Sequence, residues 1–139
     1  MADKEKIGVV GTGRMGQAMV RHLIKHGYTV VAQDIEPKAV EVARGLGAEA
    51  AKTPAEVGRV CKFVIVAVGY DEEASAVMLD KGGLLETMKA GTVIAVSSNC
   101  TPDHVKMLAD RVRGRGVDLH SRARQDAGRE GARQERRRA

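Results

Sequence analysis

Three glycines near the N-terminus have the spacing of a phosphate-binding turn. The segment consists of Gly11, Thr12, Gly13, Arg14, Met15 and Gly16. In a G-x-G-x-x-G pattern the first glycine permits a tight turn, the second lets a pyrophosphate approach the backbone, and the third lets a helix pack closely. A helix that begins here favours an anion, because its free N–H groups and its dipole point toward the ligand. We therefore expect residues 11–16 to bind a dinucleotide.

An acidic residue, Asp34, stands about 20 residues after the glycine pattern, the spacing of a ribose-binding carboxylate. Such a carboxylate can accept hydrogen bonds from the adenosine ribose hydroxyls, whereas a 2′-phosphate would meet it as a like charge. The next residue, Ile35, is not the arginine that would accommodate a 2′-phosphate. NAD is therefore favoured over NADP. Because Lys38 lies close by in the sequence, NADP stays an alternative. The alternative is that Asp34 merely begins a turn.

The glycine pattern lies between an expected strand and an expected helix. Residues 6–11 form a short apolar run that ends in glycine, which is typical of a buried parallel strand. Strand and helix patterns then alternate. Further strands are expected at 29–32, 63–68, 92–96 and 117–119, and helices from about Met15, Pro37, Pro54, Asp71 and Pro102. This alternation predicts an α/β, Rossmann-type doubly wound parallel sheet with both faces covered.

The turn sequence, with Met15 before the last glycine, resembles the opening motif of the β-hydroxyacid dehydrogenases. That family includes 3-hydroxyisobutyrate dehydrogenase, tartronate semialdehyde reductase and, more distantly, 6-phosphogluconate dehydrogenase. The resemblance extends over residues 6–119: residues 64–71 are similar to the family's fourth-strand segment, and residues 97–102 to its Ser-Thr-x-x-Pro stretch. It implies the N-terminal NAD(P)-binding domain of an oxidoreductase that transfers hydride between nicotinamide and a small 3-hydroxyacid.

The resemblance also implies cofactor contacts beyond the glycine turn. Val68, Gly69 and Tyr70 stand where the family's fourth strand ends beside the cofactor, with Gly69 in place of the proline of a Leu-Pro pair. Asn99 takes the place of a threonine on the nicotinamide side, where an amide can still form a hydrogen bond. No residue of this chain matches the family's catalytic lysine, its Ser-x-Gly-Gly substrate loop or its dimer-forming helical domain. We therefore expect no catalytic residue here and no activity of the chain alone, so that a hydroxyacid substrate would be bound only in a full-length enzyme.

The positive charge is concentrated at the C-terminal end. Residues 120–139 hold seven arginines and three acidic residues, whereas residues 1–119 have a net charge of only +1. The segment contains no aromatic or branched aliphatic residue, which predicts a disordered tail that follows a domain of residues 1–119. One hypothesis is that the tail results from a frameshift that truncated a two-domain enzyme. The alternative function is a non-enzymatic dinucleotide-binding module whose basic arm recruits an acidic partner.

Several other classes of function are not expected. Cys61 and Cys100 do not have metal-ligand spacing, and His22 and His26 lie four residues apart without further ligands nearby, so no metal site is predicted. The tail has neither aromatic residues for stacking on bases nor a periodic basic face, which argues against nucleic acid. No apolar run reaches the ~20 residues of a membrane span. The charged N-terminus is not typical of a signal peptide, and a cytoplasmic protein is expected.

Overall fold

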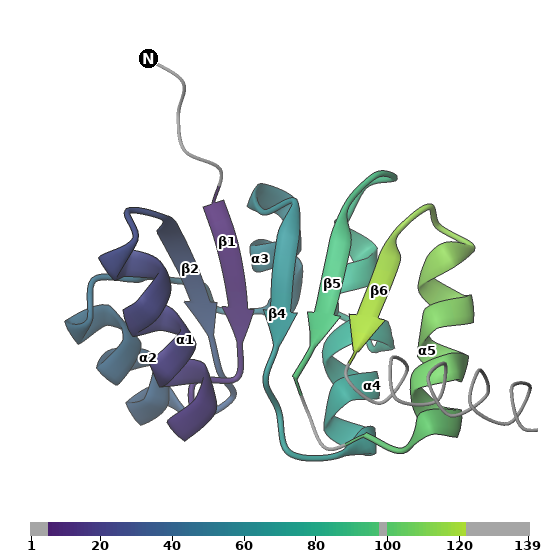
Figure 1. Ribbon diagram of the computed structural model, residues 1–139, viewed down its shortest axis with the longest axis horizontal. Coiled ribbons are helices and arrows are strands. Elements are labelled where there is room, and N and C mark those ends of the chain that lie inside the picture. Colours follow the sequence, from purple (N-terminus) through teal and green to yellow (C-terminus); the bar gives the residue numbers. More distant parts are fainter. Residues whose placement is uncertain (1–5, 98–99, 122–139) are drawn as a thin grey trace, which may run out of the picture.

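The computed structural model describes residues 6–97 and 100–121, so Asn99 and tail residues 122–139 lie outside the described residues. Strands and helices alternate along this part of the chain (Figure 1). The strands are β1 Lys6–Val10, β2 Thr29–Gln33, β3 Glu49–Ala50, β4 Phe63–Val66, β5 Val93–Val96 and β6 Asp118–Ser121. The α-helices are α1 Arg14–Lys25, α2 Pro37–Gly45, α3 Pro54–Val60, α4 Asp71–Leu79 and α5 Pro102–Arg113, with a short 3₁₀ helix at Leu84–Glu86.

The strands form one parallel sheet in the order β3-β2-β1-β4-β5-β6. The chain therefore runs outward from β1 in one direction, crosses back, and continues outward from β4 in the other. This order is that of the Rossmann fold, which confirms the predicted fold class. The direction of winding reverses between β1 and β4, and in such sheets ligands bind at that point, beyond the carboxyl ends of the strands.

Both faces of the sheet are buried, as expected for parallel strands. Successive residues of one strand point to opposite faces: Val30 packs in the cluster formed with α1 and α2, and Val31 in the cluster formed with α3, α4 and α5. Figure 1 shows α1 and α2 near the β2 side of the sheet and α5 beside β6. None of the helices in the described residues is long and apolar enough to cross a membrane.

Two helices begin at threonine caps followed by proline. The Thr53 hydroxyl accepts a hydrogen bond from the N–H of Glu56 at 3.2 Å, and the Glu56 carboxylate accepts one from the N–H of Lys52 at 2.8 Å. The Thr101 hydroxyl likewise accepts from the N–H of His104 at 3.4 Å. Both starts were predicted from the sequence, because each threonine satisfies a helix N–H that has no partner within its helix.

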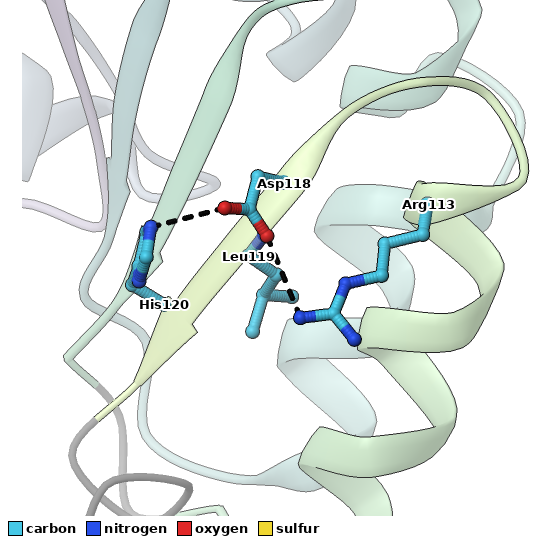
Figure 2. A network of polar contacts seen from close by, with 4 residues as sticks. All are labelled: Arg113, Asp118, Leu119 and His120. Atoms are coloured by element: carbon cyan, nitrogen blue, oxygen red, sulfur yellow. Dashed lines mark hydrogen bonds and ion pairs between the residues drawn. The ribbon is translucent and has the colours of Figure 1, made fainter.

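The last strand is longer than the sequence predicts. His120 and Ser121, which we assigned to the tail, belong to β6 and pair with Ala95 and Val96 of β5. Parallel pairing uses backbone groups, so polar side chains do not prevent it at the edge of a sheet. Figure 2 shows the Asp118 carboxylate between His120 and Arg113 of α5. Its Oδ2 lies 3.2 Å from Nε2 of His120, and its Oδ1 lies 3.6 Å from a guanidinium nitrogen of Arg113. The strand thus runs two residues beyond residue 119, where the sequence predicts the end of the domain.

Two further features of the fold were not predicted. Strand β3 was not predicted, because it consists of only two exposed residues, Glu49 and Ala50, and joins the sheet through pairing with Val31 and Ala32 of β2. In α2, Val42 is 45% exposed, whereas Ala43 beside it is completely buried. The short α2 presents a narrower apolar face than the run of small apolar residues suggests.

Candidate functional site

A cavity of about 550 Å³ opens at the carboxyl ends of the central strands, where the winding reverses. Its wall includes the last residues of β1 and β2 and the segment after β4. Predicted site residues that line it are Gly11, Gly13, Asp34, Ile35, Val68 and Gly69. Residues that line it but were not predicted include Gln33, Lys52, Thr53, Val77 and Lys81.

The three glycines of the turn have different geometric requirements. Gly11 has a φ of +97°, and a Cβ on it would lie 2.4 Å from the carbonyl oxygen of Ala67. A Cβ on Gly16 would lie 1.8 Å from the carbonyl oxygen of Gly11, so only glycine lets α1 approach the turn this closely. A Cβ on Gly13 would meet no atom within 4 Å. Gly13 is therefore not required by the packing of the chain, and the open space beside it belongs to the cavity.

Within the described residues, the N-terminus of α1 has no side-chain cap. Its N-cap residue is Gly13, which provides no side-chain hydrogen bond, and its first turn contains no acidic residue. In contrast, α3 and α5 are capped by threonine and α4 begins with three acidic residues. An anion at α1 would receive the N–H groups and the positive end of the helix dipole. The arrangement at α1 therefore suits a phosphate group of a ligand.

Asp34 lies directly after β2 and is held by backbone groups on both sides. Its Oδ2 accepts hydrogen bonds from the N–H of Thr12 at 2.7 Å and from the Thr12 hydroxyl at 3.4 Å. Its Oδ1 accepts one from the N–H of Glu36 at 2.8 Å. A carboxylate has about four acceptor positions, so one position on Oδ1 stays available to a ligand hydroxyl. Asp34 is thus fixed in orientation and still able to accept from a ribose.

Two lysines, Lys52 and Lys81, also line the cavity. The carbonyl of Lys52 accepts a hydrogen bond from the side chain of Gln33, the last residue of β2, at 3.4 Å. The turn that follows Lys81 is also fixed there, because the carbonyl of Gly82 accepts from the N–H of Ala55 in α3 at 2.9 Å. Neither lysine was singled out by the sequence, since the β3 pairing and the end of α4 bring them to the cavity.

The segment after β4 forms the other side of the cavity. The N–H of Gly69 donates to the Glu73 carboxylate of α4 at 3.2 Å, and both residues line the cavity. Val68 lines it as well, whereas Tyr70 is 70% exposed and lies outside the lining. This segment therefore offers backbone and apolar side-chain surface, together with one carboxylate that already has a partner.

The remaining predicted residues of the glycine turn do not line the cavity. Thr12 is completely buried and bonded to Asp34, and Gly16 is buried beneath the turn. Arg14 and Met15 are exposed in the first turn of α1, with Met15 53% exposed. Their contribution to a ligand would come from backbone N–H groups at the helix start. Asn99 lies outside the described residues.

Beyond the cavity, the starts of α4 and α5 are joined by Asp71. Its carboxylate accepts from the N–H and the hydroxyl of Thr101, each at 2.9 Å. Partial desolvation raises the pKa of Asp71, but the hydrogen bonds from Thr101 and Cys100 and the nearby His104 outweigh it, so the pKa lies below its usual value. Asp71 is therefore a structural carboxylate that stays ionised near neutral pH rather than a candidate acid or base.

Metal binding has no support in the described part of the chain. No group of three or more histidine, cysteine, aspartate or glutamate side chains there could hold a metal ion. His22 of α1 and His26, the C-cap of that helix, pack edge to face with ring centroids 5.5 Å apart, and both are exposed.

The sequence of the chain matches, over residues 6–122, the family described as the NAD binding domain of 6-phosphogluconate dehydrogenase. The match includes the glycine turn, Asp34 and every strand of the sheet. The chain belongs to this family. The Rossmann fold is therefore that of a nicotinamide dinucleotide-binding domain.

Curated relatives of this NAD-binding domain are hydroxyacid dehydrogenases. Mitochondrial 3-hydroxyisobutyrate dehydrogenase of Mus musculus is 32% identical over 117 residues, which are 84% of this chain and 35% of that protein. The 2-(hydroxymethyl)glutarate dehydrogenase of Eubacterium barkeri is 32% identical over 113 residues, 81% of this chain and 38% of that protein. The chain thus spans little more than a third of the length of these relatives.

Solved structures share its fold. The 3-hydroxyisobutyrate dehydrogenase of Mycobacterium tuberculosis, determined with L-serine, superposes with a TM-score of 0.80 at 20% identity, over 85% of this chain and 40% of that one. An imine reductase of Myxococcus stipitatus has a TM-score of 0.74 at 22% identity in its complex with NADP⁺, over 84% of this chain and 39% of that one. A variant of that reductase, solved with NAD⁺, has a TM-score of 0.73 at 22% identity, over 85% and 38%. Neighbours of this fold therefore hold either cofactor.

Proposed function

We propose that this chain binds NAD(H) in the cavity at the carboxyl ends of β1, β2 and β4. The pyrophosphate lies at the N-terminus of α1, and the adenosine ribose lies beside Asp34. The observation that carries this proposal is the open space at Gly13, directly at a helix start that has no side-chain cap. An anionic group that enters there meets backbone N–H groups without a side chain in the way.

NAD(H) is the preferred cofactor in this proposal because of Asp34. A 2′-phosphate would be placed against a carboxylate that backbone hydrogen bonds hold in place at the cavity wall. Lys52 and Lys81 line the same cavity and provide the opposing argument, since a cation there would attract a 2′-phosphate. Asp34 dominates because it is fixed from two sides, whereas both lysine side chains are exposed and can turn into water.

The enzyme class proposed for the complete protein is a dehydrogenase of small 3-hydroxyacids, as in the relatives that it matches. Bound nicotinamide would accept or donate the hydride. The residues of this chain would bind the dinucleotide, orient it across the sheet and exclude water from its phosphates. We propose that the 139-residue chain by itself binds the cofactor without turning over a hydroxyacid.

Isothermal titration calorimetry with NADH, NADPH and ADP-ribose tests this function. We expect NADH to bind at least about tenfold more tightly than NADPH, equivalent to ~1.4 kcal/mol. ADP-ribose, which contains the adenosine and the pyrophosphate, should bind measurably by itself. If NADPH bound more tightly than NADH, the argument from Asp34 would be wrong, and if none of the three bound, the dinucleotide site itself would be wrong.

A further inference from the structure

Gln33 is a buried polar residue whose side chain reaches the cavity. It is the last residue of β2, it is only 7% exposed, and it lines the cavity, as Asp34 does. Its backbone carbonyl accepts a hydrogen bond from the N–H of Gly11 at 2.8 Å, which holds the end of β2 against the glycine turn. Buried carboxamides are normally hydrogen-bonded, because an unpaired buried polar group costs free energy. The partners of this side chain therefore indicate what the cavity can bind.

The Gln33 carboxamide is paired within the chain at its nitrogen. Nε2 donates to the carbonyl of Lys52 at 3.4 Å, and a carbonyl oxygen only accepts, so this bond decides which end of the amide is nitrogen. In the part of the chain that the structure describes, Oε1 has no hydrogen-bond partner. No fully enclosed side-chain nitrogen or oxygen of the described residues lacks a partner, so Oε1 is open to the cavity. Oε1 and the second N–H of Nε2 are thus available to a ligand.

Gln33 lies on the face of the sheet from which the cavity opens. It shares this face with Val31, two residues earlier, which packs in the cluster formed with α3, α4 and α5. Pro54, the first residue of α3, and Val77 of α4 line the cavity on the same face. Asp34 directly follows Gln33 in the chain. A base attached to a ribose at Asp34 therefore enters the cavity beside the Gln33 carboxamide.

The other side chains of the cavity suit the faces of a purine base. Apolar residues that line it include Val10, Pro54, Val68, Ala76 and Val77. A flat base packs its faces on such side chains, whereas its edge requires donors and acceptors at fixed positions. Lys52 and Lys81 only donate, so they cannot accept from an amino group. Asp80 also lines the cavity and is the competing acceptor, but it is exposed, whereas Oε1 of Gln33 is held in place by the bond of Nε2.

We propose that Gln33 recognises the adenine base of NAD(H). Its Oε1 accepts a hydrogen bond from the 6-amino group, and its Nε2 donates to a neighbouring ring nitrogen, as glutamine does when it recognises adenine in nucleic acids. This inference rests on the function proposed for the cavity. Hypoxanthine has an oxygen in place of the amino group and would set one acceptor against another. The amide cannot turn over to suit it, because Oε1 would then face the carbonyl of Lys52.

Calorimetric titration of the full chain with NADH and with its hypoxanthine analogue, deamino-NADH, tests this recognition. The unaltered chain should bind NADH at least about tenfold more tightly, because the analogue leaves Oε1 without a donor. Gln33→Met keeps the length of the side chain without its polar atoms, so the ratio of the two affinities should fall below about twofold, mainly through weaker binding of NADH. Gln33→Leu is a second variant with the same expected ratio.

Two control variants should keep the tenfold preference. Gln17→Met removes a carboxamide that donates to the carbonyl of Thr12 at 2.9 Å and does not line the cavity. It reports any effect of loosening the glycine turn, which should weaken both ligands equally. Asp80→Asn removes the charge of the competing acceptor. A preference that disappears in either control would overturn the assignment to Gln33.

The remaining outcomes distinguish this inference from the proposed function. If the unaltered chain binds neither dinucleotide nor ADP-ribose, the function proposed for the cavity is overturned. If it binds NADH and deamino-NADH equally well, the cofactor site stands and Gln33 does not recognise the base. This comparison requires no variant, so it decides the matter even where a substitution at Gln33 prevents folding. A tenfold preference that persists in folded Gln33→Met or Gln33→Leu would likewise overturn the inference.

Discussion

The backbone N–H of Thr12 donates a hydrogen bond of 2.7 Å to Oδ2 of Asp34, which ties the glycine turn after β1 to the end of β2. The hydroxyl of the same threonine approaches the same oxygen at 3.4 Å, and Thr12 is completely buried. The carboxylate proposed to select the ribose is therefore also a support of the turn proposed to bind the pyrophosphate. The two halves of the adenosine diphosphate site are not independent of each other.

Replacing Asp34 should therefore affect both cofactors. In Asp34→Ala, NADH loses a ribose acceptor and the turn loses its bonds at Thr12, so NADH should weaken by about tenfold or more. The 2′-phosphate of NADPH no longer meets the negative charge of Asp34, but the glycine turn is less ordered, so the affinity for NADPH should rise little. The ratio of the NADH affinity to the NADPH affinity therefore falls, mainly because NADH binds more weakly. Titration of Asp34→Ala with each cofactor measures this ratio.

The control for Asp34 is Glu36→Ala. Glu36 is an exposed carboxylate two residues away whose N–H, not its side chain, bonds to Asp34, so the substitution removes a nearby charge and keeps that bond. Cofactor affinities should stay close to those of the unaltered chain. A gain in NADPH affinity in Asp34→Ala as large as the loss in NADH affinity would show that Asp34 acts on the ribose alone.

Gly13 and Gly16 should respond in opposite ways to the same substitution. In Gly13→Ala or Gly13→Val the side chain enters open space, so the urea midpoint should stay nearly unchanged while NADH binding is abolished or strongly reduced. In Gly16→Ala the Cβ would be forced against the carbonyl oxygen of Gly11, which should destabilise the chain by about 2 kcal/mol or more. Urea unfolding and calorimetry on the three variants check both statements. Normal NADH affinity in Gly13→Val, together with a native circular dichroism spectrum, would place the phosphates elsewhere.

Much of the fold could be predicted because its determinants are local. Apolar runs mark β1, β4 and β5, and Thr53-Pro54 and Thr101-Pro102 mark two helix starts by their hydrogen-bonding capacity. Strand β3 and the end of β6 have no such determinant, since exposed or polar residues join the sheet there only because a paired neighbour offers free backbone groups. Such pairing depends on tertiary structure and leaves little trace in the local sequence.

The candidate site also combines residues that the local sequence indicates with residues that only the tertiary structure brings there. The glycine turn and Asp34 were found because close backbone approach and a fixed carboxylate require particular residue types at fixed spacing. Lys52, Lys81 and Val77 reach the cavity through β3 and the end of α4, and nothing in their own sequence neighbourhood indicates a ligand. The bond between Thr12 and Asp34 was also not foreseen, because any residue at position 12 offers the same backbone N–H.

The purified chain should bind NADH and yet show no dehydrogenase activity. No residue of this chain matches the catalytic lysine that the resemblance to the β-hydroxyacid dehydrogenases implies, so no acid or base is expected beside the nicotinamide. The measurement is NADH formation from NAD⁺ with 3-hydroxyisobutyrate and related 3-hydroxyacids. A rate that Gly13→Val abolishes would contradict the prediction, whereas a rate that persists in Gly13→Val would point to a contaminating enzyme.

The buried thiol of Cys61 should make the chain less stable at alkaline pH. Burial raises the pKa of Cys61 from 9.0 to about 11, with the charge of Lys6 lowering it slightly and that of Glu49 raising it. The folded state thus holds the thiol proton more tightly than the unfolded state, and this contribution to stability is fully present below pH 9.0 and is lost as the pH rises toward about 11. Urea unfolding across this window, for the unaltered chain and for Cys61→Ala, isolates the effect, because the two proteins differ only in this thiol. The free energy of unfolding should fall more steeply with pH in the unaltered chain, and parallel curves for the two proteins would show that Cys61 ionises as easily when folded as when unfolded.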